Sequence, residues 1–554
     1  MKPELLRRLA NYLLVAIPIF AALWVWLSAL SFVPVPWPDD SAFYFVAREL
    51  FKWPPRWVML PQAPFEPTYR IWNFNTMPLY PLLIGFARLI GIDGIWALKI
   101  LPLGFWAASG SVLAWMLRRA QLPWLFTLSV ILAFAMDPTL RWASVLLRPE
   151  SLIGLCGMIL VLELCLPRPP NAAPDTDWPH WYRDKIAILL ALAAYAHFNA
   201  VHLVFPVLAA YAFRPKRLIS VAAHTSLFLV PWALTVLWHF KLFVYQMGVQ
   251  WERLAVPNGW LSSVNSALQG MFQSLGSPIA WPADLIYASY WLWLLVFLAG
   301  LGVAYVIYAF FFLPQPDPKL PQVQLAPASA WVASSLWLWH NKPEVWFTYY
   351  LHEAIWCFAG VLMLDLYLRK NARERALNWG LCAGTAACGL LFLGVNWLQA
   401  SELSNTRTWN WKAYHDFVDC IDRQLTFKEA WNTAHPKPGS SSPVFQVWDP
   451  TFPDVTVELS RRHPNWDLTR TNDFQSRTQL ALHHGDEVDA VVITEMLNWP
   501  ERWIESPMDE HPEIPSVWMT WKEYYLYHLL DNRAWKLDRH LCQVGRWQAF
   551  IYMK

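Results

Sequence analysis

Long apolar runs separated by short polar segments dominate the first 400 residues of the chain. A bilayer core of about 30 Å is crossed by roughly 20 apolar residues in a helix, and shorter spans occur inside bundles. The pattern predicts about eleven transmembrane helices, at residues 10–33, 95–117, 123–138, 150–166, 186–199, 201–213, 218–246, 285–313, 326–339, 344–368 and 377–397. A shorter apolar stretch at 78–90 predicts a helix lying at the membrane interface.

The composition supports a mainly α polytopic membrane protein. Of 554 residues, 56% are hydrophobic and only 15% are charged, against about 25% charged in ordinary globular chains. This excludes a disordered chain and argues against an ordinary soluble enzyme. The net charge of +2 gives no reason to expect a nucleic-acid partner.

The distribution of Lys and Arg predicts the orientation. Before residue 398, the loops that are cytoplasmic when the N-terminus is inside carry most of the loop Lys and Arg residues, as cytoplasmic loops do in membrane proteins. We therefore predict a multi-pass protein of the plasma (inner) membrane with a cytoplasmic N-terminus. Loops 34–77 and 247–284 and everything after 398 then lie outside. The first apolar run is longer than the 7–15 residues of a signal peptide, which favours an anchor.

The sequence divides at about residue 398 into a transmembrane module, 1–397, and an extracytoplasmic α/β domain, 398–554. The second part has no run long enough to span a membrane. It has strand-like segments at 443–448, 455–459, 490–494 and 547–553 and amphipathic helical segments at 411–424 and 521–532.

Two of the seven cysteines, Cys420 and Cys542, lie in the predicted outer domain. The outside of a bacterial or secretory membrane is oxidising, so a disulfide between them is one interpretation. Two buried thiols are the other. No Cys/His spacing indicates a structural metal.

Two adjacent carboxylates, Asp39 and Asp40, open an amphipathic helix just beyond the first predicted span. Acidic residues at this position often only cap a helix, because they accept hydrogen bonds from free N–H groups. Two in tandem also fit a general base or a metal ligand, since adjacent carboxylates perturb each other's pKa.

The chain resembles the GT-C class of membrane glycosyltransferases, in particular the branch of the lipid A aminoarabinose transferase and the protein O-mannosyltransferases. The first matching stretch is the acidic pair followed by Tyr44, Ala47, Arg48 and Glu49. The proline-rich stretch 75–91 resembles that branch's re-entry into the membrane, although Met77 stands where the family often has lysine. Further matches are Arg148-Pro149-Glu150 and, more weakly, residues 346–350.

The resemblance implies a GT-C fold and transfer of a sugar from a polyprenyl-phosphate donor to an acceptor on the outer face, usually with inversion. It implies that Asp39 or Asp40 is the general base. The chemistry agrees, because direct displacement needs a base on the acceptor hydroxyl, whereas a phosphate leaving group needs cations. No cofactor is certain. A divalent metal ion stays open, since some GT-C enzymes use one and others do not.

Five cations at the predicted outer membrane level are candidates for binding the donor phosphate: Arg148, Lys241, Arg56, Arg70 and Arg253. Arg148 is the first choice because a family element surrounds it. The alternative for each is that its long side chain reaches the lipid headgroups.

Eight residues are candidates for lining a substrate cavity: Tyr44, Glu150, His197, His202, Tyr349, Tyr350, His352 and Glu353. His352 and Glu353 lie about two turns into the tenth predicted span, where an ionisable side chain is costly and so indicates function. The alternative is that they only satisfy neighbouring polar groups in the bundle.

The sequence therefore predicts a polyprenyl-phosphate-sugar-dependent glycosyltransferase, in the lipid bilayer, with a glycan, lipid or protein acceptor. A transporter or flippase of polyprenyl lipids or glycans is the main alternative. A carrier should bind near the bilayer midplane, whereas this chain concentrates polar groups in outer loops. A non-catalytic assembly protein would need neither Asp39 nor Asp40.

Overall fold

The computed structural model describes residues 3–32, 38–57, 72–74, 76–166, 177–254, 323–341, 345–369, 372–406, 411–435, 445–449, 455–470, 489–496, 538–544 and 547–553. Its contacts divide the chain into two compact units. Unit 1 comprises Met1–Trp26, Met77–Tyr80 and Ile100–Gln399, and unit 2 comprises Leu27–Thr76, Pro81–Lys99 and Ala400–Lys554. The two units are described separately.

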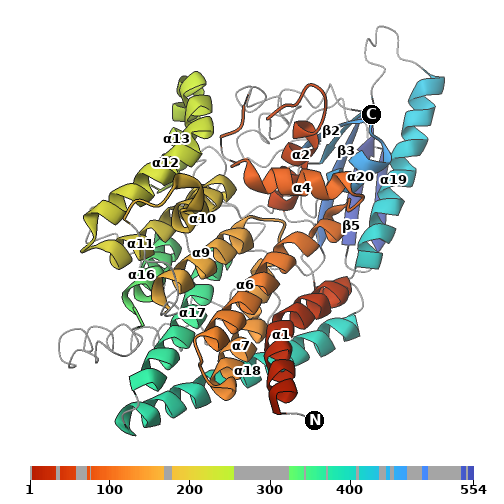
Figure 1. Cartoon of the computed structure of the whole chain (residues 1–554). Helices are drawn as coiled ribbons and strands as arrows, with labels where there is room; N and C mark the ends of the chain where they lie inside the picture. The colour runs from red at the N-terminus through yellow and green to blue at the C-terminus, as the bar shows by residue number, and fades with distance from the viewer. Residues whose placement is uncertain are drawn as a thin grey trace. The chain divides into compact units, whose positions relative to one another are not determined.

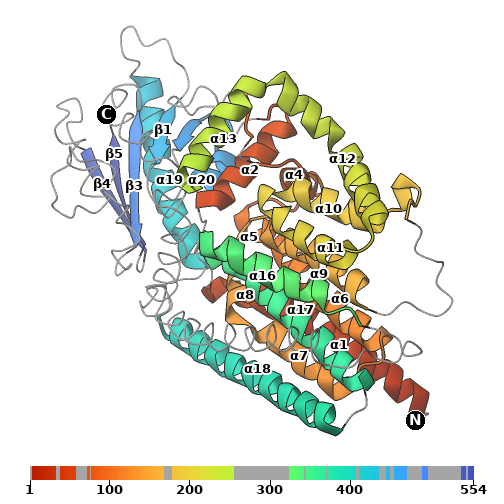
Figure 2. The same ribbon diagram turned by 90° about the vertical axis from the view of Figure 1, so that its left-hand side faces the viewer.

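Unit 1 is a helical bundle (Figure 1). It contains most of α1 (Pro3–Phe32) and of α18 (Ala372–Thr406), together with α6 (Ile100–Arg119), α7 (Trp124–Met136), α8 (Pro138–Ala143), α9 (Glu150–Cys165), η1 (Trp181–Arg183), α10 (Lys185–Ala196), η2 (Phe198–Leu203), α11 (Val204–Tyr211), α12 (Pro215–Trp238), α13 (Phe240–Leu254), α16 (Ala326–Asn341) and α17 (Val345–Arg369). Helix α9 is apolar and buried on nearly all sides, as a central helix must be. It packs against α6, α10, α16 and α17 (Figure 2).

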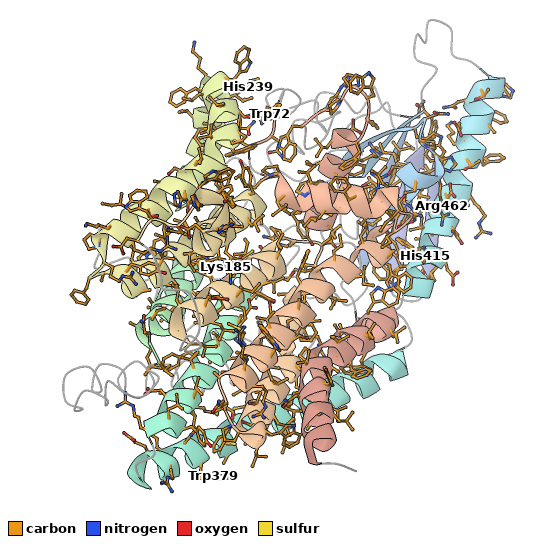
Figure 3. All side chains as sticks on the ribbon, viewed as in Figure 1. Trp72, Lys185, His239, Trp379, His415 and Arg462 are labelled. Atoms are coloured by element: carbon orange, nitrogen blue, oxygen red, sulfur yellow. A yellow bond between two sulfur atoms is a disulfide. The ribbon has the colours of Figure 1, made fainter. Side chains whose placement is uncertain are left out.

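Five helical segments are long and apolar enough to cross a membrane: Leu9–Leu27, Ile95–Arg119, Pro215–Trp238, Tyr349–Arg369 and Glu374–Gly394. Large apolar side chains such as Phe20, Leu234 and Leu390 are exposed on α1, α12 and α18, and Trp379 is labelled on α18 in Figure 3. Apolar surface on helices of this length is expected to face lipid. The protein is an integral membrane protein.

The predicted number of about eleven spans is not established by these five. The predicted spans at 123–138, 150–166, 186–199, 201–213 and 326–339 correspond to shorter helices. The predicted span 218–246 is wrong as a single helix, because α12 ends at Trp238 and α13 begins at Phe240. The predicted span 285–313 lies outside the described residues. The predicted interfacial helix at 78–90 matches α4 (Leu79–Leu89).

A buried ion pair fastens α10 to α12 at the ends predicted to be cytoplasmic. Arg217 donates from Nη1 and Nη2 to the two carboxylate oxygens of Asp184, at 2.6 and 2.7 Å. Nδ1 of His224 lies 2.9 Å from Asp184 Oδ2. Asp184 also accepts from the backbone N–H of Ala187 and so caps α10. One carboxylate therefore satisfies both a helix end and a buried cation.

Unit 2 is an α/β unit. It contains α2 (Pro38–Leu50), most of α4, α5 (Ile95–Leu98), α19 (Trp411–Ala434), α20 (Thr456–Arg462) and strands β1 (Gln446–Asp449), β2 (Asp467–Arg470), β3 (Ala490–Met496), β4 (Asp538–Val544) and β5 (Trp547–Met553). The strand order is β2-β1-β3-β5-β4, parallel from β2 to β3 and antiparallel from β3 to β4. Helix α19 packs against β4 and β5. Residues of the predicted first outer loop thus belong to the same unit as the C-terminal part.

The predictions for the C-terminal part are confirmed for α19, β1, β3 and β5, and wrong for 455–459. The alternation of Val455, Val457 and Leu459 predicts a strand there, but the segment forms helix α20. All residues from 455 to 460 are buried, and Glu458 pairs with Arg461 at 2.7 Å, a spacing that only a helix brings together. Strands β2 and β4 carry no clear signal in the sequence, and 521–532 lies outside the described residues.

The structure joins Cys420 on α19 to Cys542 on β4 by a disulfide, with Cα atoms 5.8 Å apart. The five other cysteines are buried free thiols. Arg462, labelled in Figure 3, adds ion pairs from α20 to Asp419 and Asp422 of α19. Helix α19 is therefore fixed to the sheet covalently and to α20 by charge.

We expect Cys420→Ser and Cys542→Ser to destabilise unit 2 by about 4 kcal/mol, because the bond closes a loop with a sequence separation of 122 residues. Thermal unfolding of the purified protein measures this. The double variant serves as the control: it should unfold like either single variant, and additive effects would show that the two thiols act separately.

Candidate functional site

The acidic pair opens α2, and the structure gives Asp40 a defined partner. Asp40 is fully buried, and its Oδ2 lies 3.2 Å from Nζ of Lys99, which is itself only 1% exposed. A buried carboxylate is tolerated when a cation compensates for lost hydration, and Lys99 is placed to do so. The side chain of Asp39 lies outside the described residues.

Tyr44 takes part in a second polar network in unit 2. Its hydroxyl donates to Oδ1 of Asp93 at 3.2 Å, and Arg88 donates to the same oxygen at 2.9 Å. Burial alone would raise the pKa of Asp93, but the hydrogen bond and charge of Arg88 outweigh it, so this pKa lies below its ordinary value. Arg461 of α20 also pairs with Asp93, at 3.4 Å. This network fastens α2 to α20.

A larger group of buried polar side chains lies in unit 1, where α7, α9 and α17 begin or end next to η2. The orientation predicted from Lys and Arg places these helix ends on the outer face, so we call the group the outer polar cluster. Within it, Tyr349 is in electrostatic reach of Asp137 and Glu353, and Tyr350 of Arg148 and Glu150. Its members, all buried, are Asp137, Arg148, Glu150, His202, Tyr349, Tyr350, His352 and Glu353.

Asp137 is the most heavily hydrogen-bonded member. Its Oδ1 accepts from the backbone N–H of Thr139 and Leu140, at 2.8 and 3.2 Å, and so caps α8. Its Oδ2 lies 2.7 Å from Nδ1 of His352 and accepts from Nε1 of Trp356 at 2.8 Å. Because α8 and α17 share this carboxylate, the His352 ring is held in one orientation.

Glu353 lies against α9. A Cβ atom at Gly154 would stand 1.8 Å from its Oε2 and 2.7 Å from Cε1 of Tyr349, so only glycine leaves room for these two side chains. Both Glu353 carboxyl oxygens are buried and have no hydrogen-bond partner that meets geometric criteria among the described residues. Ser109 of α6 is close enough for its hydroxyl group to interact with the Glu353 carboxyl group.

The remaining members surround Arg148. This arginine donates from Nε and Nη2 to Oε1 of Glu150, at 3.1 and 2.9 Å. The His202 ring packs on Tyr350, with centroids 4.7 Å apart, and its Nδ1 lies 2.5 Å from the Asn199 carbonyl oxygen. The cluster thus contains one cation, three carboxyl groups, two imidazoles and two phenols.

Several predicted site residues lie elsewhere. Lys241 on α13 is exposed and makes no hydrogen bond or ion pair with the described part of the chain, and the Arg56 side chain is exposed in unit 2. His239, labelled in Figure 3, lies between α12 and α13, two residues before Lys241. His197 accepts from the Asn199 N–H and caps η2. Arg70 and the side chain of Arg253 lie outside the described residues.

Sequence reasoning missed three residues that the structure makes prominent. Lys99 stands in an otherwise apolar run, which is a signal that a partner is buried with it. Trp356 follows His352 by one helical turn and shares its partner Asp137. Gly154 carries no signal of its own. Among the residues that the structure describes, no three His, Cys, Asp or Glu side chains are placed to hold a metal ion.

Comparison with solved structures gives a similarity in fold. No protein family and no curated protein matches the sequence. The crystal structure of ArnT from Cupriavidus metallidurans bound to undecaprenyl phosphate is similar to this structure at a TM-score of 0.44, with 13% identical residues over 97% of this chain and 97% of that one. At this level the similarity carries no argument about residues or activity.

We expect Lys99→Met to destabilise the protein by about 3–5 kcal/mol, because it leaves the Asp40 carboxylate buried without its cation. The double variant Asp40→Asn/Lys99→Met should recover much of this loss in a thermal unfolding assay. Lys185→Met is the matched control, since Lys185 (Figure 3) is exposed and lies 3.7 Å from Glu163. Equal losses for Lys99→Met and Lys185→Met would contradict the interpretation.

Gly154→Ala should destabilise unit 1 by about 1–3 kcal/mol, because the new methyl group overlaps Glu353 and Tyr349. Combining it with Glu353→Ala should relieve the overlap with the carboxyl group. Gly384→Ala in α18 is the control, as no atom lies within 4 Å of a Cβ there. The measurement is the unfolding midpoint, in detergent, of wild type, the two single glycine variants and the double variant. A decrease in the Gly384→Ala variant as large as in the Gly154→Ala variant would contradict the steric explanation.

Proposed function

We propose that the protein is a GT-C glycosyltransferase that moves a sugar, with inversion, from a polyprenyl-phosphate donor to a glycan, lipid or protein acceptor. The reaction takes place on the outer face of the inner membrane, with the N-terminus cytoplasmic and residues 398–554 outside. The observation that supports this most is the outer polar cluster, a buried guanidinium beside buried phenols, imidazoles and carboxyl groups within membrane helices. A phosphate-linked sugar on a lipid needs such a combination of groups.

The proposed reaction is a direct displacement. The acceptor hydroxyl oxygen attacks the anomeric carbon, the bond from that carbon to the phosphate oxygen breaks, and the phosphate leaves with the electron pair. A carboxylate of α2, Asp39 or Asp40, takes the hydroxyl proton. Lys99 holds the Asp40 carboxyl group in a defined position, and the resemblance of this stretch to GT-C enzymes supports the role for either residue.

The leaving phosphate needs positive charge, and Arg148 is the proposed source. Of the predicted phosphate ligands whose side chains the structure describes, Arg148, Lys241 and Arg56, it is the buried one. A buried cation interacts with an anion more strongly than an exposed one does, because water screens it less. Lys241, Arg56, Arg70 and Arg253 are then proposed to contact lipid headgroups.

The first test is transfer of labelled sugar from a panel of undecaprenyl-phosphate-linked sugars by the purified protein in nanodiscs. Wild type should release undecaprenyl phosphate from one of them. Asp39→Asn or Asp40→Asn should lower kcat by about 10²–10⁴-fold, the usual effect of losing a general base, and Arg148→Gln should also lower it. Release of undecaprenyl phosphate, followed by mass spectrometry, gives the rate.

The control variants remove a carboxylate and an arginine that lie outside both the Asp40–Lys99 pair and the outer polar cluster. Asp177→Asn takes away an exposed carboxylate that pairs with Arg214 at 3.1 Å, and Arg183→Gln takes away an exposed arginine; both should keep wild-type turnover. Full activity in both Asp39→Asn and Asp40→Asn would exclude the proposed base. Tight binding of the lipids without turnover would favour the flippase.

A further inference from the structure

We propose that the Asp137–His352 pair is a hydroxyl-binding site for the sugar of the lipid donor. Nε2 of His352 accepts a hydrogen bond from a sugar hydroxyl, and Asp137 is the positioning residue. The inference rests on the proposed function for the identity of the ligand, and on the geometry of unit 1 for the site.

The contacts of Asp137 determine which His352 nitrogen carries hydrogen. Its carboxylate already accepts three N–H groups, from Thr139, Leu140 and Trp356, so it faces His352 as an acceptor. Nδ1 of His352, 2.7 Å away, is therefore the protonated nitrogen. In the neutral ring Nε2 then carries the lone pair, since the hydrogen bond at one nitrogen fixes the tautomer at the other.

The second observation is the state of Nε2 itself. His352 is 2% exposed, and this nitrogen is buried without a hydrogen-bond partner among the residues that the structure describes. Leaving a buried acceptor unpaired costs about 1–3 kcal/mol, and native structures rarely accept that cost without a function. The bonds from Asp137 to α8 prevent the ring from turning away.

The charges around His352 select the ligand. Asp137 is a carboxylate in direct contact, and Glu353 is the next residue along α17. Tyr349, which is in electrostatic reach of Asp137 and Glu353, adds a hydroxyl group without charge. A phosphate here would face carboxyl groups, whereas a sugar hydroxyl can donate to Nε2 and accept from a phenol. This end of the cluster therefore suits the sugar.

The test uses His352→Asn, because the asparagine amide N–H₂ replaces Nδ1–H toward Asp137 while the Nε2 acceptor disappears. The ligands are undecaprenyl phosphate and the undecaprenyl-phosphate-linked sugar that turns over, or the glucose derivative if none does. Affinities are measured in nanodiscs without acceptor. His224→Asn is the matched control, since His224 makes the same kind of Nδ1 contact, 2.9 Å, with Asp184 at the opposite end of unit 1.

We expect wild type to bind the sugar-bearing lipid more tightly than the bare one. His352→Asn should weaken binding of the sugar-bearing lipid about five- to tenfold, the value of one hydrogen bond, and leave bare undecaprenyl phosphate within about twofold. His224→Asn should change neither affinity. The unfolding midpoint of His352→Asn should stay near that of wild type because the bond to Asp137 is kept.

Three results would overturn the proposal: unchanged affinity for both lipids in His352→Asn, an equal loss for both, or no preference of wild type for the sugar-bearing lipid. Failure of the enzyme proposal gives a different pattern. If the sugar preference depends on His352 but no sugar is transferred, the hydroxyl-binding site is supported and the transferase proposal is wrong. If sugar is transferred but His352→Asn leaves donor binding unchanged, the transferase proposal is supported and the hydroxyl-binding site is wrong.

Discussion

Burial of charge in an apolar environment is the constraint on which the rest of this structure depends. A charged group removed from water loses several kcal/mol of hydration unless an opposite charge and hydrogen bonds replace it. Asp40 with Lys99, Arg148 with Glu150 and Asp184 with Arg217 each meet this requirement. Two of these pairs, Asp40–Lys99 and Asp184–Arg217, join segments that are far apart in the sequence.

The exceptions to this rule in unit 1 are the informative residues. Among the described residues, both oxygens of Glu353, Nε2 of His352 and the hydroxyls of Tyr349 and Tyr350 lack a hydrogen-bond partner. All four residues belong to the first turns of one helix, α17, while its later turns are almost wholly apolar and buried. Buried polar atoms without such a partner occur elsewhere in unit 1 too, for example in Trp106, Thr225 and Ser335. The group on α17 differs from these because its members are carboxyl, imidazole and phenol groups within two turns of one helix.

The sequence was sufficient for elements whose pattern is local. Long apolar runs predict helices because burial or lipid contact requires them over many residues, and Cys420 and Cys542 could be paired because only two cysteines lie after residue 398. The prediction failed where tertiary contacts decide. Val455, Val457 and Leu459 alternate like a strand, yet burial of both faces and the Glu458–Arg461 pair favour α20. The partner of Asp40 is far along the chain, and no local spacing indicates Lys99.

For the site residues too, the sequence indicates the residue types but not their tertiary contacts. The sequence analysis selected His202, Tyr349, Tyr350, His352 and Glu353 because such residue types are rare in apolar helices, and the structure buries all five. Their selection could not show that Asp137 orients His352, since that contact joins residues 215 positions apart. Nor could it show that Gly154 makes room for Glu353.

The distribution of charge within the outer polar cluster adds a last constraint on how a lipid-linked sugar would lie. Arg148, paired with Glu150, stands at the start of α9, whereas the Asp137 carboxylate lies against His352 of α17. Tyr350 is in electrostatic reach of both Arg148 and Glu353. An anionic phosphate is attracted to Arg148 and repelled by the Asp137 carboxylate, and a neutral sugar is tolerated beside both. The cluster alone therefore favours one direction of the headgroup, with phosphate toward Arg148 and hydroxyls toward His352.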